Sequence, residues 1–142
     1  MISIVDIKKS INLILKTNFE NVNIYAGEVK EGFKKPSFFV QLFVENNDLF
    51  SGEISENSIT VEIVYLTVDK IELENIKIYE RLKKFFNLPI QICDRKILPR
   101  NIRANFNDFL SFRFNLKFYD DVQIKPEQYE KMGELDINFK KE

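Results

Sequence analysis

The segment from Leu110 to Tyr119 alternates without a break between apolar and polar side chains. The apolar set is Leu110, Phe112, Phe114, Leu116 and Phe118, and the residues between them are Ser111, Arg113, Asn115 and Lys117. Successive side chains of a β-strand point to opposite faces of its sheet, so this pattern predicts a strand with one buried and one wet face. Antiparallel sheets accommodate that asymmetry, whereas parallel sheets are covered on both faces. We therefore expect an antiparallel sheet.

The segment from Ser37 to Val44 is apolar on both faces of a predicted strand. One face would carry Phe38, Val40, Leu42 and Val44, and the other Phe39, Gln41 and Phe43. Such a strand needs a cover on each face. The helices of the same domain supply one cover, and the other is either a neighbouring subunit or the interior of the same domain. Phe39, Gln41 and Phe43 are accordingly candidate contacts to another subunit or to a further partner.

The remaining elements are read from periodicity and from turn residues. Amphipathic helices are predicted from Ile4 to Lys16, with Ser3 as N-cap, and from about Asp69 to Phe86. Shorter strands are predicted at Asn21–Tyr25, Ser58–Thr67, Ile90–Asp94 and Ile97–Phe106, and Pro99 directs the last of them to a sheet edge or a bulge. This order predicts an α+β fold with two helices packed on one face of a mostly antiparallel sheet. Residues 1–142 suit a single domain, with a polar tail from about residue 120.

The segment from Glu45 to Asn57 is polar and predicts a loop. It contains four acidic residues and no basic residue: Glu45, Asp48, Glu53 and Glu56. A hairpin loop in solvent explains this composition. The alternative is an acidic surface that faces the lumen of a ring, where negative charge would keep passing DNA from adhering.

The composition argues against most enzyme chemistry. The chain has no histidine, so Ser-His-Asp and Cys-His sites cannot form within it. Its four glycines form no phosphate-binding loop, and no metal-binding motif occurs. Cys93 lies in an apolar segment and is expected to be an inert buried thiol. Asp120 and Asp121 could bind Mg²⁺ as in nucleases, but a solvated turn is the commoner arrangement. We expect no catalytic activity, no cofactor and no metal.

Charge and hydropathy argue against some classes of partner, namely nucleic acid bound by net charge, anionic lipid and membrane. The net charge of −1 provides no strong overall attraction to nucleic acid or anionic lipid. A basic stretch could touch DNA phosphates or protect an exposed strand edge, and it consists of Arg95, Lys96, Arg100 and Arg103. No apolar run approaches the roughly 20 residues that a membrane helix needs, so no membrane partner is expected. The single cysteine excludes an internal disulfide and favours an intracellular place of assembly.

Several short motifs resemble the tail terminator (tail-completion) proteins of contractile-tailed phages and of phage-tail-like bacteriocins from Gram-positive bacteria. The most specific motif is Gly32-Phe-Lys-Lys-Pro-Ser-Phe-Phe-Val-Gln-Leu42. The others are Ile7-Lys-Lys-Ser-Ile11, Ile24-Tyr25 and Met132-Gly-Glu-Leu135. The resemblance extends from the first helix to the Met132 motif. It departs at Asn107-Asp108-Phe109, where the family would have an Asp-Gly turn, so the hairpin type there stays open.

The resemblance implies a hexameric ring at the head-proximal end of the tail tube, where it stops tube polymerisation and presents a surface to the neck. Its partners would be further copies of the chain, the tail tube protein, sheath and neck or connector proteins, and passing DNA without sequence recognition. Its location would be a virion or a phage-tail-like particle assembled in the cytoplasm of the bacterial host. Two alternatives are a head–tail adaptor that binds portal-side rings and a metal-dependent nuclease that uses Asp120 and Asp121.

Overall fold

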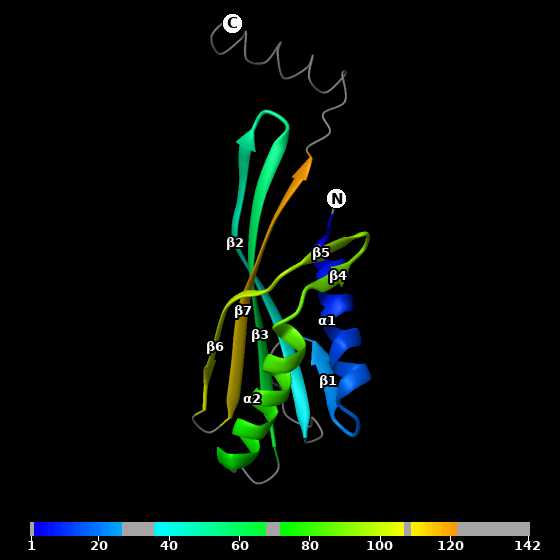
Figure 1. Ribbon diagram of the computed structural model, residues 1–142, viewed down its shortest axis with the longest axis vertical. Coiled ribbons are helices and arrows are strands. Elements are labelled where there is room, and N and C mark those ends of the chain that lie inside the picture. Colours follow the sequence, from blue (N-terminus) through cyan, green and yellow to red (C-terminus); the bar gives the residue numbers. More distant parts are fainter. Residues whose placement is uncertain (1, 27–35, 68–71, 107–108, 122–142) are drawn as a thin grey trace, which may run out of the picture.

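The computed structural model describes residues 2–26, 36–67, 72–106 and 109–121, with the backbone alone at residues 50 and 51 (Figure 1). The elements in this part are α1 (Ile4–Asn18), β1 (Asn23–Ala26), β2 (Ser37–Ser51), β3 (Ile54–Leu66), α2 (Glu72–Phe86), β4 (Ile90–Ile92), β5 (Arg95–Ile97), β6 (Arg100–Asn105) and β7 (Leu110–Asp121). One sheet has the strand order β1-β2-β3-β7-β6, and β4 and β5 form a separate pair. Within the larger sheet only β1 and β2 are parallel. The predicted α+β fold with a mostly antiparallel sheet is therefore confirmed.

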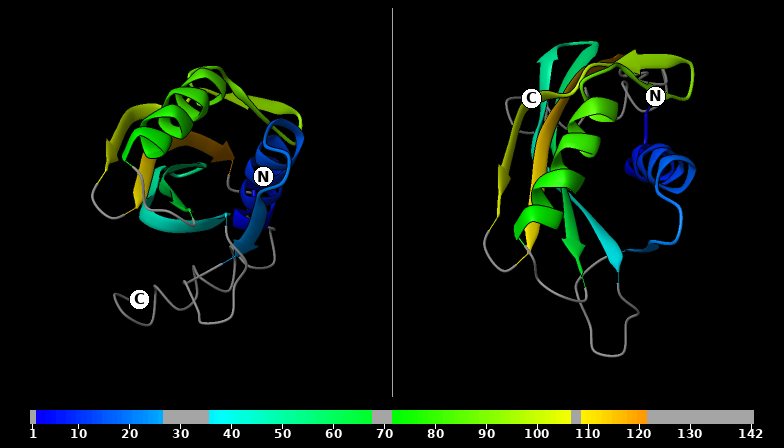
Figure 2. Two further views of the ribbon diagram at one scale, coloured as in Figure 1. Left: turned by 90° about the horizontal axis from the view of Figure 1, so that it is seen from below. Right: turned by 60° about the horizontal axis from the view of Figure 1, so that its bottom comes forward.

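Both helices lie on the same face of the sheet, as predicted (Figure 2). A capping box starts α1, because the Ser3 hydroxyl accepts a hydrogen bond from the Asp6 N–H and the Asp6 carboxylate accepts one from the Ser3 N–H. The side chains at every fourth position of α1 are buried, namely Ile7, Ile11 and Leu15. The helix α2 buries Ile78, Leu82 and Phe86 in the same way. These two apolar stripes fix which side of each helix meets the sheet.

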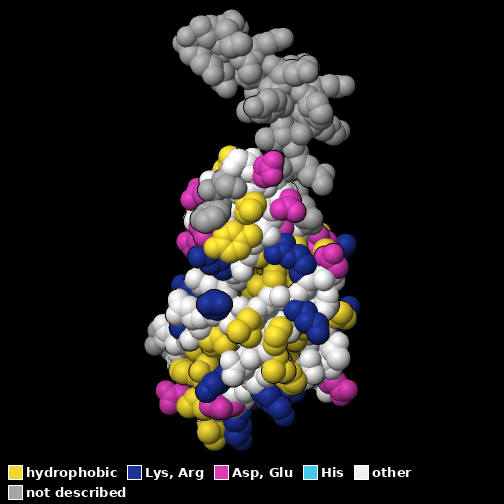
Figure 3. Space-filling view, turned by 45° about the horizontal axis from the view of Figure 1, so that its top comes forward, with side chains coloured by type: hydrophobic (Ala, Val, Ile, Leu, Met, Phe, Trp, Pro, Cys, Tyr) yellow, Lys and Arg dark blue, Asp and Glu magenta, His cyan; other side chains and the backbone are white. Residues whose placement is uncertain are grey.

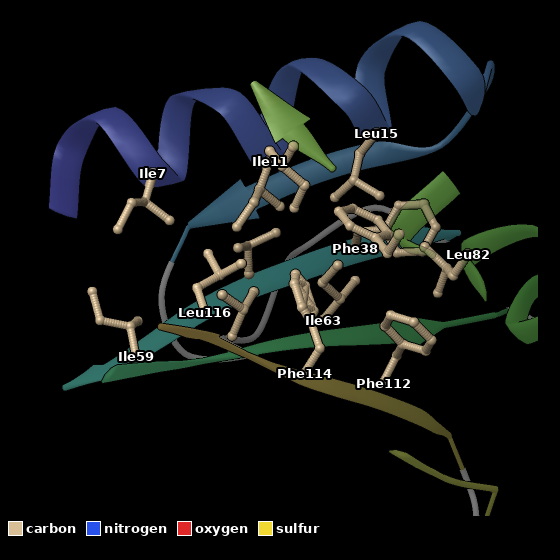
Figure 4. Close-up of a cluster of buried hydrophobic side chains, with 14 of the residues drawn as sticks. Ile7, Ile11, Leu15, Phe38, Ile59, Ile63, Leu82, Phe112, Phe114 and Leu116 are labelled. Carbon is tan, nitrogen blue, oxygen red and sulfur yellow. The ribbon is translucent and has the colours of Figure 1, made fainter. Parts of the chain in front are cut away.

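The core lies between the helices and the sheet face that they cover, which we call the inner face (Figure 4). The alternation predicted for β7 is confirmed, since its five apolar side chains are at most 4% exposed. Phe86 of α2 stacks on Phe114 with ring centroids 5.0 Å apart, and it lies 6.0 Å from Phe112. These three rings join α2 to the centre of the sheet. The opposite sheet face is called the outer face below.

The prediction of a loop from Glu45 to Asn57 was wrong. β2 continues to Ser51 and β3 begins at Ile54, so the connection is a tight turn at Gly52 and Glu53. We call residues 45–57 the arm. It projects beyond the helices, and the end of β7 runs beside it (Figure 1). Because neither α1 nor α2 covers this part of the hairpin, both of its faces can carry polar side chains while the backbone keeps its strand pairing.

The strand predicted from Ile90 to Asp94 ends at Ile92, and the prediction of a buried Cys93 was wrong. β4 and β5 form a hairpin whose turn includes Cys93, with φ 56°, and the thiol is exposed. Partial desolvation, followed by the neighbouring Asp6 carboxylate, raises the pKa of Cys93, which disfavours the reactive thiolate. Pro99 separates β5 from β6, and β6 is an edge strand as that proline predicted.

Several predicted features lie outside the described residues. They are the start of the second helix at Asp69, the turn at Asn107-Asp108, and the polar tail beyond residue 121 with its Met132 motif. Neither helix of the described part is long and apolar enough to cross a membrane.

Candidate functional site

The centre of the outer face is a polar network on β3 and β7. Glu62 lies opposite Arg113 in the strand register. Its Oε2 is 2.8 Å from Arg113 Nη2 and 3.0 Å from Arg113 Nε, and Ser111 Oγ donates to the same oxygen at 2.8 Å. Glu62 is only 8% exposed, so these donors compensate a carboxylate that has been largely removed from water. The sequence predicted a wet face at Ser111 and Arg113. Arg113 is exposed, but Ser111 is buried because the strand register brings it into the Glu62 network, and no local pattern encodes that register.

Arg113→Ala is expected to lower the free energy of unfolding by about 1–3 kcal/mol, because it leaves a nearly buried carboxylate without a cation beside it. Lys117→Ala is a matched control on the same face of the same strand. Lys117 pairs with Glu56 at 3.2 Å, at a position where the carboxylate is more exposed, so its loss should matter less. Urea denaturation followed by circular dichroism measures both variants. Equal losses would show that burial of Glu62 does not control this interaction.

The three residues of β2 predicted to contact a partner occupy different environments. Phe39 is 2% exposed and stacks on Tyr25 with ring centroids 5.2 Å apart, so its own chain covers it, contrary to the expectation of a partner. Gln41 is partly buried. Phe43 lies opposite Thr60 on the outer face and is 44% exposed. The internal interpretation therefore holds for the first part of β2, and Phe43 retains apolar surface for a contact.

The acidic residues predicted to share a loop all lie on the arm: Glu45, Asp48, Glu53 and Glu56. The first three are exposed, whereas Glu56 is partly buried. Hydrogen bonds from the Tyr119 hydroxyl and then from Lys117 lower the pKa of Glu56, so this carboxylate is ionised and already partnered. The arm thus presents three acidic side chains to its surroundings. That they face a lumen stays a prediction.

The basic stretch separates into different surfaces. Arg95 turns away from the outer face and pairs with Asp120, whereas Arg103 lies directly opposite Arg113, and Arg100 opposite Asn115. Arg103 Nη1 donates to the Asn101 carbonyl at 2.8 Å and to Asn115 Oδ1 at 3.1 Å. A cleft of about 260 Å³ lies beside these side chains on β6 and β7, and its lining consists of Arg103, Ala104, Asn105, Ser111 and Arg113.

The adjacent carboxylates at the end of β7 do not converge. Asp120 is 5% exposed, and its Oδ1 lies 2.6 Å from Arg95 Nη1, while the next residue, Asp121, is exposed. The prediction of a solvated turn was wrong for Asp120, because the strand continues through it and turns its side chain inward. No group of three or more potential metal ligands occurs among the residues described. Asp120 and Asp121, which the nuclease alternative would use, thus belong to opposite faces of β7.

Comparison with known proteins gives a family assignment. The family model described as phage tail terminator protein matches residues 6–130, which include every described strand and the arm. A search of curated proteins found no match. The matched region contains the whole Gly32–Leu42 motif, and its Ser37–Leu42 part forms the beginning of β2, which is buried as far as Val40. The resemblance to phage tail terminator proteins is thereby confirmed over residues 6–130: the chain belongs to the phage tail terminator protein family and is a structural, virion-associated component of a phage tail.

Proposed function

We propose that this protein forms a ring of six copies that caps the head-proximal end of the tail tube. In that position it stops the addition of tube protein and joins the tail to the neck, in a contractile-tailed phage or in a headless tail-like particle. The observation that carries the proposal is the tail terminator family match over residues 6–130.

The mechanism is recognition of a surface. A tube polymerises because each added ring exposes a binding face for the next one, and a terminator offers one such face without the other. Contacts of this kind rely on apolar anchors, complementary charge and shape. Phe43 supplies exposed apolar surface, and the arm extends the sheet beyond the chain's own core. In a closed ring the contact is heterologous, so one patch of each copy meets a different patch of the next.

Purified protein mixed with polymerising tube protein tests the proposal. We expect the protein to form rings by light scattering, and we expect electron microscopy to show tubes that stop growing with the ring at one end. Tubes of unrestricted length with bare ends would contradict the proposal. Binding to portal-side rings in place of tube ends would instead favour the adaptor role.

Phe43→Asp is expected to abolish capping while the fold is retained, because the change places a charge on exposed apolar surface that a partner would bury. Leu13→Asp is the matched control, since Leu13 is 65% exposed on α1, away from the outer face. Circular dichroism checks the fold, and microscopy measures tube length. If folded Phe43→Asp limits tube length as well as the control does, Phe43 is not part of the contact.

A further inference from the structure

In the part of the chain that the structure describes, acidic side chains without an ion-pair partner lie on the arm, and basic side chains without one lie on β6. The ion pairs among the described residues are Arg95–Asp120, Arg113–Glu62 and Lys117–Glu56. They leave Glu45, Asp48 and Glu53 on the arm without a cation, and Arg100 and Arg103 on β6 without a carboxylate. The arm lies in the upper half of Figure 1 and β6 in the lower half. Acidic side chains gather at the arm end in Figure 3, where that end is turned forward.

The arginines on β6 and β7 are arranged so that a bound anion would stabilise them. Arg103 and Arg113 are direct cross-strand neighbours, and like charges in that position repel each other. Glu62 offsets Arg113, but the acceptors of Arg103 are a backbone carbonyl and an amide, both neutral. The two guanidinium groups line the cleft of about 260 Å³, which has room for one or two side chains. A carboxylate entering it would find charged donors on both strands.

We propose that the acidic arm of one copy docks in the β6–β7 cleft of the next copy, with Asp48 and Glu53 facing Arg103 in the cleft and Arg100 on β6 outside its lining. Asp48 lies opposite Glu56 and so belongs to the outer face, the same face as Arg113. Glu53 lies in the turn, at the tip of the arm. This inference rests on the proposed ring and names the contact that would build it.

The acidic arm and the β6–β7 cleft lie too far apart in one chain to contact each other, so the partner is a second copy. β3 and β7 hold the arm and the cleft apart within one chain, so the two cannot satisfy each other intramolecularly. Two different patches that complement each other on identical subunits produce a heterologous contact, which closes into a ring when the rotation permits. Both patches also lie at sheet edges in the described part, since β6 ends the sheet and β1 pairs with β2 only as far as Val40. Charge at such edges prevents indiscriminate strand pairing and selects an edge of opposite charge.

Two charge-reversal variants of the full chain test the contact. The arm variant is Asp48→Lys with Glu53→Lys, and the cleft variant is Arg100→Glu with Arg103→Glu. In each variant alone, the arm and the cleft carry the same sign of charge, so like charges face each other at every contact. We expect self-association to weaken by about 100-fold, as like-charge juxtaposition across an interface implies. An equimolar mixture should recover association, because alternating copies then meet with opposite charges at every contact. Lys83→Glu with Lys84→Glu, on the last turn of α2, is the control and should assemble like the unmodified chain.

Sedimentation velocity measures assembly, and circular dichroism verifies the fold of each variant. Loss in both variants with recovery in the mixture supports the contact. Normal assembly of either folded variant overturns it, as does a mixture of folded variants that stays dissociated. If the cleft variant loses retention on DNA while the arm variant assembles normally, the cleft binds nucleic acid and the inference fails. Failure of the unmodified chain to form rings, alone or on tube ends, refutes the proposed function itself.

Discussion

Phe112→Ala is expected to lower the free energy of unfolding by about 3–5 kcal/mol, the usual cost of truncating a buried aromatic ring. Phe112 is fully buried and lies within 6.0 Å of both Phe86 and Phe114, measured between ring centroids. Its ring also lies 5.9 Å from Tyr79 on α2. The substitution therefore opens a cavity where the second helix meets the central strands.

Phe109→Ala is the matched control, because Phe109 is 41% exposed just before the same strand begins. Its effect should stay under about 1 kcal/mol, as for most surface substitutions. Urea unfolding followed by circular dichroism measures both variants. A loss at Phe109 as large as that at Phe112 would mean that the burial pattern of β7 is incorrect.

Arg95→Ala is expected to cost about 2–4 kcal/mol, because it leaves the Asp120 carboxylate unpaired in a nearly dry site. Among the described residues, the remaining donor to that side chain is the Ile2 N–H at 3.4 Å, which is too long to compensate the charge. The guanidinium also lies over the Phe118 ring, 5.7 Å from its centroid, so some packing is lost with it. The cost is below that of a fully buried pair because the Arg95 side chain is 36% exposed.

The double variant Arg95→Ala with Asp120→Asn separates charge from packing. An amide has nearly the shape of the carboxylate but carries no charge, so the double variant should be more stable than Arg95→Ala alone. Thermal and chemical unfolding measure the difference. If the double variant is no more stable, the loss in Arg95→Ala comes from packing, and the buried charge of Asp120 is not its cause.

The elements that the sequence predicted well are those in which one periodicity continues over many residues. The buried stripe of α1 repeats at every fourth residue behind a Ser3 cap, and the alternation in β7 is unbroken. Both patterns follow directly from helix and strand geometry. They sufficed to predict two helices on one face of a mostly antiparallel sheet.

The arm could not be predicted in this way, because its residues are polar and include Asn, Asp and Ser, which are depleted in strands. It is a strand pair because β2, β3 and β7 continue to pair beyond the helices, as Asp48 with Glu56 and Glu56 with Tyr119 show. The cover of Phe39 was missed for a similar reason. It comes from Tyr25 through a parallel register, and no local pattern encodes a register.

The candidate site was predicted only in part. Exposure of Phe43 and of three arm carboxylates agrees with the expectation of an accessible surface. The Glu62–Arg113 pair and the cleft beside Arg103 depend on how β3, β7 and β6 align, which joins residues as far apart as 51 positions in the chain. Charge composition alone gave Arg95 and Arg103 the same role, whereas the fold directs them to different sides of the sheet.

The position of β7 between β3 and β6 has a consequence for how the protein is made. β3 cannot complete its pairing until β7 has been synthesised. The contacts between these two strands span 49 residues at Glu62–Ser111 and 65 residues at Ser55–Asp120. At bacterial rates of about 5–20 residues per second, translation of that interval takes several seconds. During this time the β2–β3 hairpin has formed its own pairing while the apolar row of β3 and one whole strand edge remain uncovered on the ribosome. Neighbouring nascent chains on one messenger present the same edge, so slow elongation or crowded polysomes favour mispairing between copies before any ring can assemble.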